Sequence, residues 1–183
     1  MSDSKQLVKQ LREMTGAGIL DCKKYLIKAN NDINEAIKLF RSEAGVKADK
    51  KGSRIAAEGL VNFYQNDDSI ILLELNSETD FVARDENFIN LAESIAKKLL
   101  ENNESDVTKE ITNDITSVIS KLGENIKLRR YLKVKKVNSV YGYTHNNKIA
   151  SLVELKKDDE ALAKDICMQI VASNPLSLDE TSI

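Results

Sequence analysis

The first 43 residues carry the apolar spacing of three short helices. We expect Ser4 to cap the first, Thr15-Gly16-Ala17-Gly18 to end it, and Asn30-Asn31 to end the second. Asp32 starts the third, with Glu35 in the capping-box position. The apolar faces of the three helices are formed by Leu7, Val8 and Leu11, by Cys22, Leu26 and Ala29, and by Ile33, Ala36, Ile37 and Phe40.

From Glu58 onward the spacing changes to that of strands. A polar turn separates the first two strands, an acidic loop at 101–109 separates two helices, and Gly123 stops the second helix. The basic residues of the last strand alternate, which indicates the exposed face of a half-buried strand. The predicted elements are strands at 60–64 and 69–75, helices at 87–100 and 111–122, and a strand at 129–137.

The strand pattern then repeats. Residues 140–155 parallel 60–75 at an offset of 80, so that Leu72-Leu73-Glu74-Leu75 matches Leu152-Val153-Glu154-Leu155. The helix that follows matches at an offset of 71, through Leu91 to Ile95 and Leu162 to Ile166. The two offsets differ by nine residues, which lie between strand and helix in the first copy. This duplication predicts two related units, each with a small antiparallel sheet and a helix.

The connection Ser77–Arg84 lies where these extra residues are, and it places Phe81 among charged side chains. Phe81 and Val82 can fold back as a plug under the helix, the commoner fate of a lone Phe. The second copy, however, closes its core with a short connection, so the architecture does not require the longer one. We therefore expect Phe81 and Asp80 to project as a contact element for a partner.

Composition indicates a globular protein of 183 residues, 42% hydrophobic and 31% charged, with a net charge of −2 and no Trp. Neither the charge nor the 5% aromatic content favours direct nucleic-acid binding. No apolar run is long enough to span a membrane, and the polar start carries no targeting pattern. We expect a cytoplasmic protein, with an organellar mature form left open. Around 46–57, Lys47, Lys50, Lys51 and Arg54 favour a solvated linker or a basic helix face over a phosphate site.

The motifs of phosphate loops, dinucleotide-binding turns and nucleophile elbows are absent. Cys22 and Cys167 lack metal-ligand spacing; a disulfide between them is conceivable, but buried reduced thiols are favoured. One histidine, His145, cannot build a metal site alone. We expect no catalytic residues, no cofactor and no metal, and hence not an enzyme. A thiol or hydrolytic enzyme that uses either cysteine with His145 is the alternative from another class.

Four motifs resemble one family, bacterial translation elongation factor Ts. They are Leu11-Arg12-Glu13-Met14-Thr15-Gly16-Ala17-Gly18-Ile19-Leu20-Asp21-Cys22-Lys23-Lys24, Glu74 to Arg84, Leu122-Gly123-Glu124-Asn125-Ile126 followed by Arg129-Arg130, and Tyr143-x-His145. The resemblance is colinear from Leu7 to about Leu176. Departures are Met14, where a basic residue is usual, Tyr25 for a small one, and Asn146 and Ala150 for glycines.

The resemblance implies an α+β fold: an N-terminal three-helix domain like the ubiquitin-associated (UBA-like) domain at 1–45, a basic linker at 46–57, and a duplicated two-layer α/β core. The core comprises an N-subdomain at 58–137 and a C-subdomain at 138–183. Longer members continue with a helical hairpin and a closing β segment. We therefore expect a C-terminally short form with an incomplete second subdomain, either truncated or with fewer strands. Oligomeric state stays open.

The family's activity is guanine-nucleotide exchange on elongation factor Tu, a GTPase, by displacing Mg²⁺ and promoting GDP release. The resemblance assigns Mg²⁺ displacement to Thr79, Asp80, Phe81 and Val82. It assigns partner contacts to Arg12, Ile19, Leu20, Lys23, Lys51, Leu122, Gly123 and His145. The alternative within the family is an elongation factor Tu-binding module with weak or no exchange activity. No membrane or nucleic-acid partner is implied.

Overall fold

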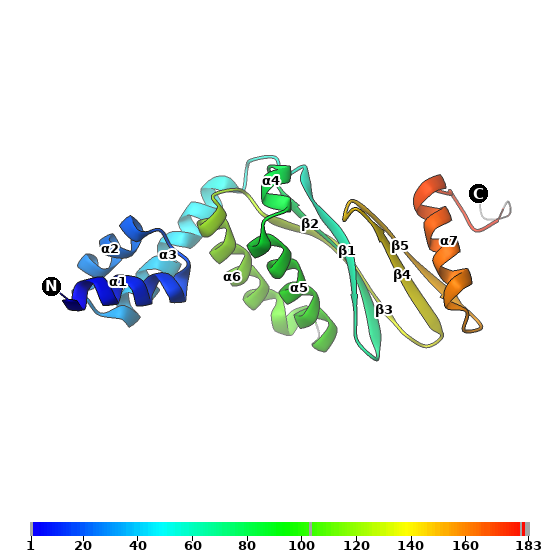
Figure 1. Cartoon of the computed structure of the whole chain (residues 1–183), viewed down its shortest axis with the longest axis horizontal. Helices are drawn as coiled ribbons and strands as arrows, with labels where there is room; N and C mark the ends of the chain where they lie inside the picture. Colours follow the sequence, from blue (N-terminus) through cyan, green and yellow to red (C-terminus); the bar gives the residue numbers. More distant parts are fainter. Residues whose placement is uncertain (1, 103, 180, 182–183) are drawn as a thin grey trace.

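The computed structural model describes residues 2–102, 104–179 and 181. Helices and small antiparallel sheets alternate along the chain, so the predicted α+β class is confirmed. Figure 1 shows successive layers along the long axis: three N-terminal helices, two helices, a three-stranded sheet, a two-stranded sheet and a last helix. The outer limits of the predicted domains, Met1 and Ile183, lie outside the described residues, as does the Lys47 side chain.

The N-terminal helices are α1 (Ser2–Thr15), α2 (Ile19–Lys28) and α3 (Ile33–Lys51). Ser4 lies inside α1, so its predicted capping role is wrong. Gly16, at φ 68°, ends α1, and the Asp32 carboxylate accepts from the Glu35 amide at 3.0 Å, which confirms the predicted start of α3. The helices enclose a small core of Leu11, Ala17, Cys22, Tyr25, Leu26, Ala29, Ala36 and Phe40.

Helix α3 runs well into the segment predicted as a linker at 46–57 and ends at Lys51. Its first half packs in the N-terminal core through Phe40, whereas Ala48 packs against the core between the central sheet and the helices α5 and α6. The helix also contacts α6 (Glu104–Leu122). Tertiary packing of small side chains thus continues the helix through Gly45, where local propensity alone would weaken it.

A three-stranded antiparallel sheet, in the order β1 (Glu58–Gln65), β2 (Ser69–Ser77), β3 (Lys127–Lys135), forms the centre. Helices α5 (Glu86–Glu101) and α6 cover one face, with Leu73, Leu75, Phe88 and Ile95 among the buried side chains between them. The loop predicted at 101–109 is wrong, because α6 begins at Glu104. The Lys133 ammonium group donates to the carbonyls of Leu99 and Leu100 at 2.7 and 3.0 Å, which ties β3 to the end of α5.

Strands β4 (Ser139–His145) and β5 (Ile149–Leu155) form a separate hairpin, and α7 (Glu160–Ser173) packs on it. Ser151 Oγ donates to the Cys167 carbonyl at 3.0 Å. On the other side the hairpin meets β1: a Cβ at Gly142 would lie 2.6 Å from the Phe63 ring. The absence of a side chain at Gly142 therefore lets the hairpin approach the central sheet closely.

Candidate functional site

The connection from β2 to α5 contains a short helix, α4 (Asp80–Ala83). Thr79 precedes it, and its Oγ1 accepts from the Val82 amide at 3.4 Å. Phe81 is 83% exposed, whereas Val82 packs against the central core. Asp80 pairs with Arg84 at 2.9 Å. The prediction that Phe81 projects is confirmed, and folding back applies to Val82 alone.

A reciprocal pair of carboxylates ties this connection to the turn after α6. Glu124 accepts from the amides of Glu78 and Thr79 at 3.1 and 2.9 Å and from Thr79 Oγ1 at 2.6 Å. In return, the Glu78 carboxylate accepts from the Asn125 amide at 2.6 Å. We call these four residues the carboxylate clamp. Two segments about 45 residues apart in sequence are thereby held together.

The clamp also contacts the segment that follows α3. The Asn125 side-chain amide donates to the Arg54 carbonyl at 2.7 Å, and the Arg54 guanidinium lies 3.5 Å from the Glu78 carboxylate. Gly123 ends α6 at φ 83°, and the Lys51 ammonium group lies 3.9 Å from where a Cβ on Gly123 would be. Two predicted contact residues, Lys51 and Gly123, therefore lie beside the Phe81 connection, with half-buried Leu122 preceding Gly123.

On the other side of α4 lies the β4–β5 turn. His145 is exposed, and its ring nitrogens lie 3.3 Å from Tyr143 Oη and 3.2 Å from the Asn146 side-chain amide. Asn146 lines a pocket of 450 Å³ together with Asp80. Asn146 and Asn147 have φ values of 52° and 55°, which asparagine tolerates and which explain why it can stand where glycine is usual. The turn and α4 lie along the same upper edge in Figure 1.

The other predicted contact residues lie on the N-terminal helices. Arg12, Leu20 and Lys23 are exposed, and Leu20 is 81% accessible. Ile19 and Lys23 line a groove of 770 Å³ between α1 and α2. The structure thus divides the predicted contact residues into two groups, one on the N-terminal helices and one around α4.

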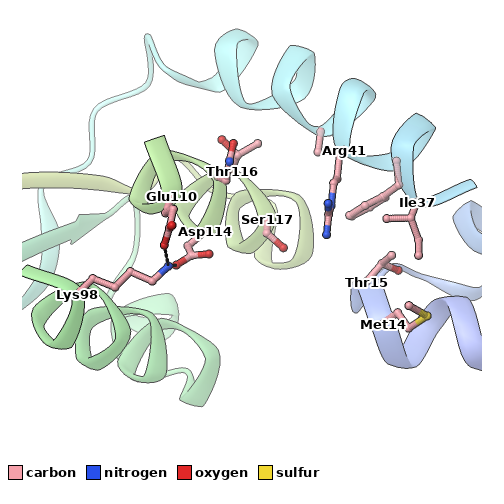
Figure 2. Close-up of a pocket in the computed structure, with 12 residues that line it drawn as sticks. Met14, Thr15, Ile37, Arg41, Lys98, Glu110, Asp114, Thr116 and Ser117 are labelled. Atoms are coloured by element: carbon pink, nitrogen blue, oxygen red, sulfur yellow. Dashed lines mark hydrogen bonds and ion pairs between the residues drawn. The ribbon is translucent and has the colours of Figure 1, made fainter. Parts of the chain in front are cut away.

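A polar pocket of 400 Å³ separates these groups, between the N-terminal helices and the α5–α6 pair. Figure 2 shows Arg41 pointing into it from α3, opposite the ion pairs that Lys98 forms with Asp114 at 2.6 Å and Glu110 at 3.5 Å. The Asp114 hydrogen bond raises the pKa of Lys98. None of the predicted site residues lines this pocket.

Both thiols are free and buried, as the sequence predicted, and burial raises the pKa of each. Cys22 donates to the Ala17 carbonyl, and Cys167 lies beneath the β4–β5 hairpin. Among residues 2–102, 104–179 and 181, no group of three or more potential ligands from His, Cys, Asp and Glu is placed to hold a metal. Within the same residues, no helix is long and apolar enough to cross a membrane.

Sequence reasoning missed the clamp. Glu78, Glu124 and Asn125 all belong to recognised motifs, but only their neighbours were assigned roles. The available signal was an acidic residue in each of two motifs, Glu78 in one and Glu124 in the other. The pairing of the two motifs depends on tertiary structure.

Comparison with known proteins gives consistent matches. A family model described as "Elongation factor TS" matches residues 78–183. The "Elongation factor Ts" of Clostridium acetobutylicum is 46% identical over 200 residues, covering 98% of this chain and 65% of the relative. Those of Legionella pneumophila (strain Paris) and Thioalkalivibrio sulfidiphilus are 43% and 41% identical, covering 98% and 100% of this chain and 66% and 67% of the relatives. The chain spans about two thirds of the length of these curated relatives.

Proposed function

The chain belongs to the elongation factor Ts family, and from that premise we propose that it is a guanine-nucleotide exchange factor for elongation factor Tu in translation elongation. It binds the GDP-bound GTPase and promotes GDP release by displacing Mg²⁺. The observation that carries the proposal is Phe81, an exposed aromatic ring on a connection anchored by the carboxylate clamp. An exposed ring on an anchored backbone is suited to insertion into a partner.

Exchange of this kind requires no covalent chemistry, so the protein acts as a binding partner and not as an enzyme. It must bind the nucleotide-free GTPase more tightly than the GDP-bound one. By reciprocity, GDP weakens the binding of this protein to the GTPase by the same factor by which the protein weakens GDP binding. The free energy for release therefore comes from contacts formed only when the nucleotide site is open.

Mg²⁺ bridges the GTPase and the diphosphate, so its loss weakens GDP binding. On this proposal Phe81 separates elements of the GTPase beside the metal, and Asp80 disturbs the polar network around it. Thr79 caps α4 and Val82 anchors it. These two residues therefore hold the connection that presents Asp80 and Phe81. The exposure of Phe81 and the anchoring of Val82 support this division of roles.

We assign further contacts to the two groups described above. The N-terminal group comprises Arg12, Ile19, Leu20 and Lys23, and the group near α4 comprises Lys51, Leu122, Gly123 and His145. The proposal includes a UBA-like domain at 1–45 and duplicated core subdomains at 58–137 and 138–183. It also includes a cytoplasmic location, without a nucleic-acid or membrane partner.

The test is release of fluorescent GDP from elongation factor Tu. We expect the chain to accelerate release, and we expect Asp80→Ala and Phe81→Ala each to lower the acceleration by about tenfold or more while most binding is kept. The control is Glu86→Ala, which removes one negative charge from an exposed position nearby. Binding without acceleration would indicate the binding module, and full activity of the double variant would contradict the proposed loop mechanism. A hydrolytic or thiol activity lost with Cys22→Ser or Cys167→Ser would indicate the enzyme.

A further inference from the structure

We propose that Glu124 is a positioning residue for exchange, which holds the backbone before α4 so that Asp80 and Phe81 face outward. The inference rests on the proposed function and deepens it. Glu124 acts through Thr79, whose amide and hydroxyl both donate to its carboxylate, at 2.9 and 2.6 Å.

Helix α4 has little to hold it by itself. It is four residues long, far shorter than a helix that is stable alone. Its own capping bond, from the Val82 amide to Thr79 Oγ1, is long at 3.4 Å. Phe81 is exposed and so contributes no packing of its own. The direction of the Phe81 ring therefore depends on how the backbone on either side of it is fixed.

Glu124 supplies what α4 lacks at its N-terminal end. Consecutive amides, those of Glu78 and Thr79, converge on the same carboxylate oxygen, and the Thr79 hydroxyl takes the other. Hydrogen bonds to a charged acceptor are stronger than bonds between neutral groups. Because both carboxylate oxygens are engaged by the connection itself, Glu124 is placed to orient the contact element and not to contact a partner directly.

The Glu124 backbone is in turn anchored on both sides. Gly123 ends α6 in a left-handed conformation, with its amide donating to the Ile119 carbonyl at 2.9 Å. Asn125 binds the Glu78 carboxylate through its amide and the Arg54 carbonyl through its side chain, at 2.6 and 2.7 Å. The clamp is thus a closed arrangement in which each motif holds the other, and it is also bonded to the segment that follows α3.

The experiment compares Glu124→Ala with Glu124→Gln in the full chain. The glutamine oxygen can accept from both amides, and its amide group can donate to Thr79 Oγ1, so it preserves the geometry without the charge. We expect Glu124→Ala to lower the acceleration of GDP release by about tenfold, with a smaller loss of binding, and Glu124→Gln to remain within about threefold of the unmodified chain. Glu86→Ala is the control for loss of one negative charge near α4.

Two further measurements separate positioning from other effects. If Glu124 acts in part through Phe81, the loss of acceleration in the Phe81→Ala/Glu124→Ala double variant is smaller than the two single losses combined. In the free chain, Glu124→Ala is expected to speed hydrogen exchange at the amides of Glu78, Thr79 and Val82. If Glu124→Ala does not fold, Glu124→Asp tests the same contact, because its carboxylate is one methylene shorter and keeps the charge; we expect it to lower the acceleration more than Glu124→Gln does.

Undiminished acceleration by Glu124→Ala, fully additive losses in the double variant, or equal losses with alanine and glutamine would each overturn the proposal. Failure of the proposed function gives a different result. The unmodified chain then does not accelerate GDP release, although slow hydrogen exchange at the amides of Glu78 and Thr79 still shows that the clamp is formed. Unchanged protection of the Thr79 amide in Glu124→Ala shows instead that the clamp does not order α4, whatever the exchange activity.

Discussion

The connections from β2 to α5 and from β5 to α7 both carry the chain from a hairpin to a helix that packs on it. The first uses eight residues, 78–85, and the second four, 156–159. The rest of the nine-residue difference found in the sequence lies in a longer β2 and an earlier start of α5. Each helix is capped by an aspartate: Asp85 accepts from the Asn87 amide at 2.8 Å, and Asp159 from the Leu162 amide at 2.9 Å.

The difference shows how a fold carries residues that its core does not need. The short connection needs little beyond its cap and the hydrogen bond that the Tyr141 hydroxyl donates to Asp158. The long one presents an exposed aromatic ring and is held by Glu124, an acceptor from a distant segment. Extra chain that serves a contact thus requires extra anchoring, because ordering each residue costs conformational entropy.

The largest effect is expected at Gly59, which pairs with Asn76 where β2 extends towards the long connection. Gly59 has φ 143°, and a Cβ there would lie 2.1 Å from the Leu75 carbonyl oxygen. We expect Gly59→Ala to lower the free energy of unfolding by about 3 kcal/mol or more, measured by denaturant titration. The matched control is Gly45→Ala in α3, where a Cβ meets nothing within 4 Å. A Gly59→Ala chain as stable as the control would contradict this account.

The two caps test whether the connections share their helix-starting chemistry. Asp85→Ala and Asp159→Ala are each expected to cost about 1 kcal/mol of unfolding free energy, because each leaves a first-turn amide without its acceptor. Thermal or denaturant unfolding measures both, with Lys164→Ala, an exposed position within α7, as the surface control. A cost confined to one variant would show that the two helices start by different means.

Phe81 and Val82 are neighbours with opposite environments. Val82→Ala removes core contacts of a half-buried side chain and is expected to cost about 1 kcal/mol of stability. Phe81→Ala is expected to change stability by no more than about 0.5 kcal/mol, since the ring is exposed. Unfolding curves of the two variants, set beside their GDP-release rates, separate anchoring from contact. A large loss of stability in Phe81→Ala would show that the ring packs in solution.

The smallest effect concerns pH and the short connection. Hydrogen bonds from Tyr141 and Ser139 lower the pKa of Asp158, so the stabilisation is complete above the ordinary aspartate value and is lost as pH falls through the lowered one. The hydrogen bond to Asp158 also raises the pKa of Tyr141. The stabilisation that Tyr141 contributes is therefore lost as pH rises through this raised pKa. Subtracting the phenolate titration of Tyr141→Phe from that of the unmodified chain gives the titration curve of Tyr141. We expect Asp158→Asn to return the Tyr141 pKa towards normal; an unchanged pKa would exclude the bond as its cause.

Local signals were enough for most elements and for the exposure of Phe81. Short apolar runs separated by polar turns predicted both hairpins, and the repeat showed which connection is the longer one. These features depend on side-chain periodicity and on turn residues such as Gly123, which are properties of neighbouring positions.

The features that the sequence did not predict depend on contacts between segments that are distant along the chain. Residues 46–51 read as a polar linker because their local sequence does not show that Ala48 has a core to pack against. The loop expected at 101–109 is polar too, but α6 begins at Glu104, and Val107 in this segment is buried in the central core. Glu124 could not be paired with Thr79 from spacing, because no periodicity connects positions 45 residues apart.

The continuity of α3 has a consequence for how a large partner is bound. At 19 residues the helix is a rod about 28 Å long, rooted in the N-terminal helices at one end and beside the clamp at the other. The distance between the two groups of contact residues is therefore set when the chain folds. A partner that touches both meets surfaces already spaced for it, and its second contact forms without the loss of freedom that a flexible tether would impose.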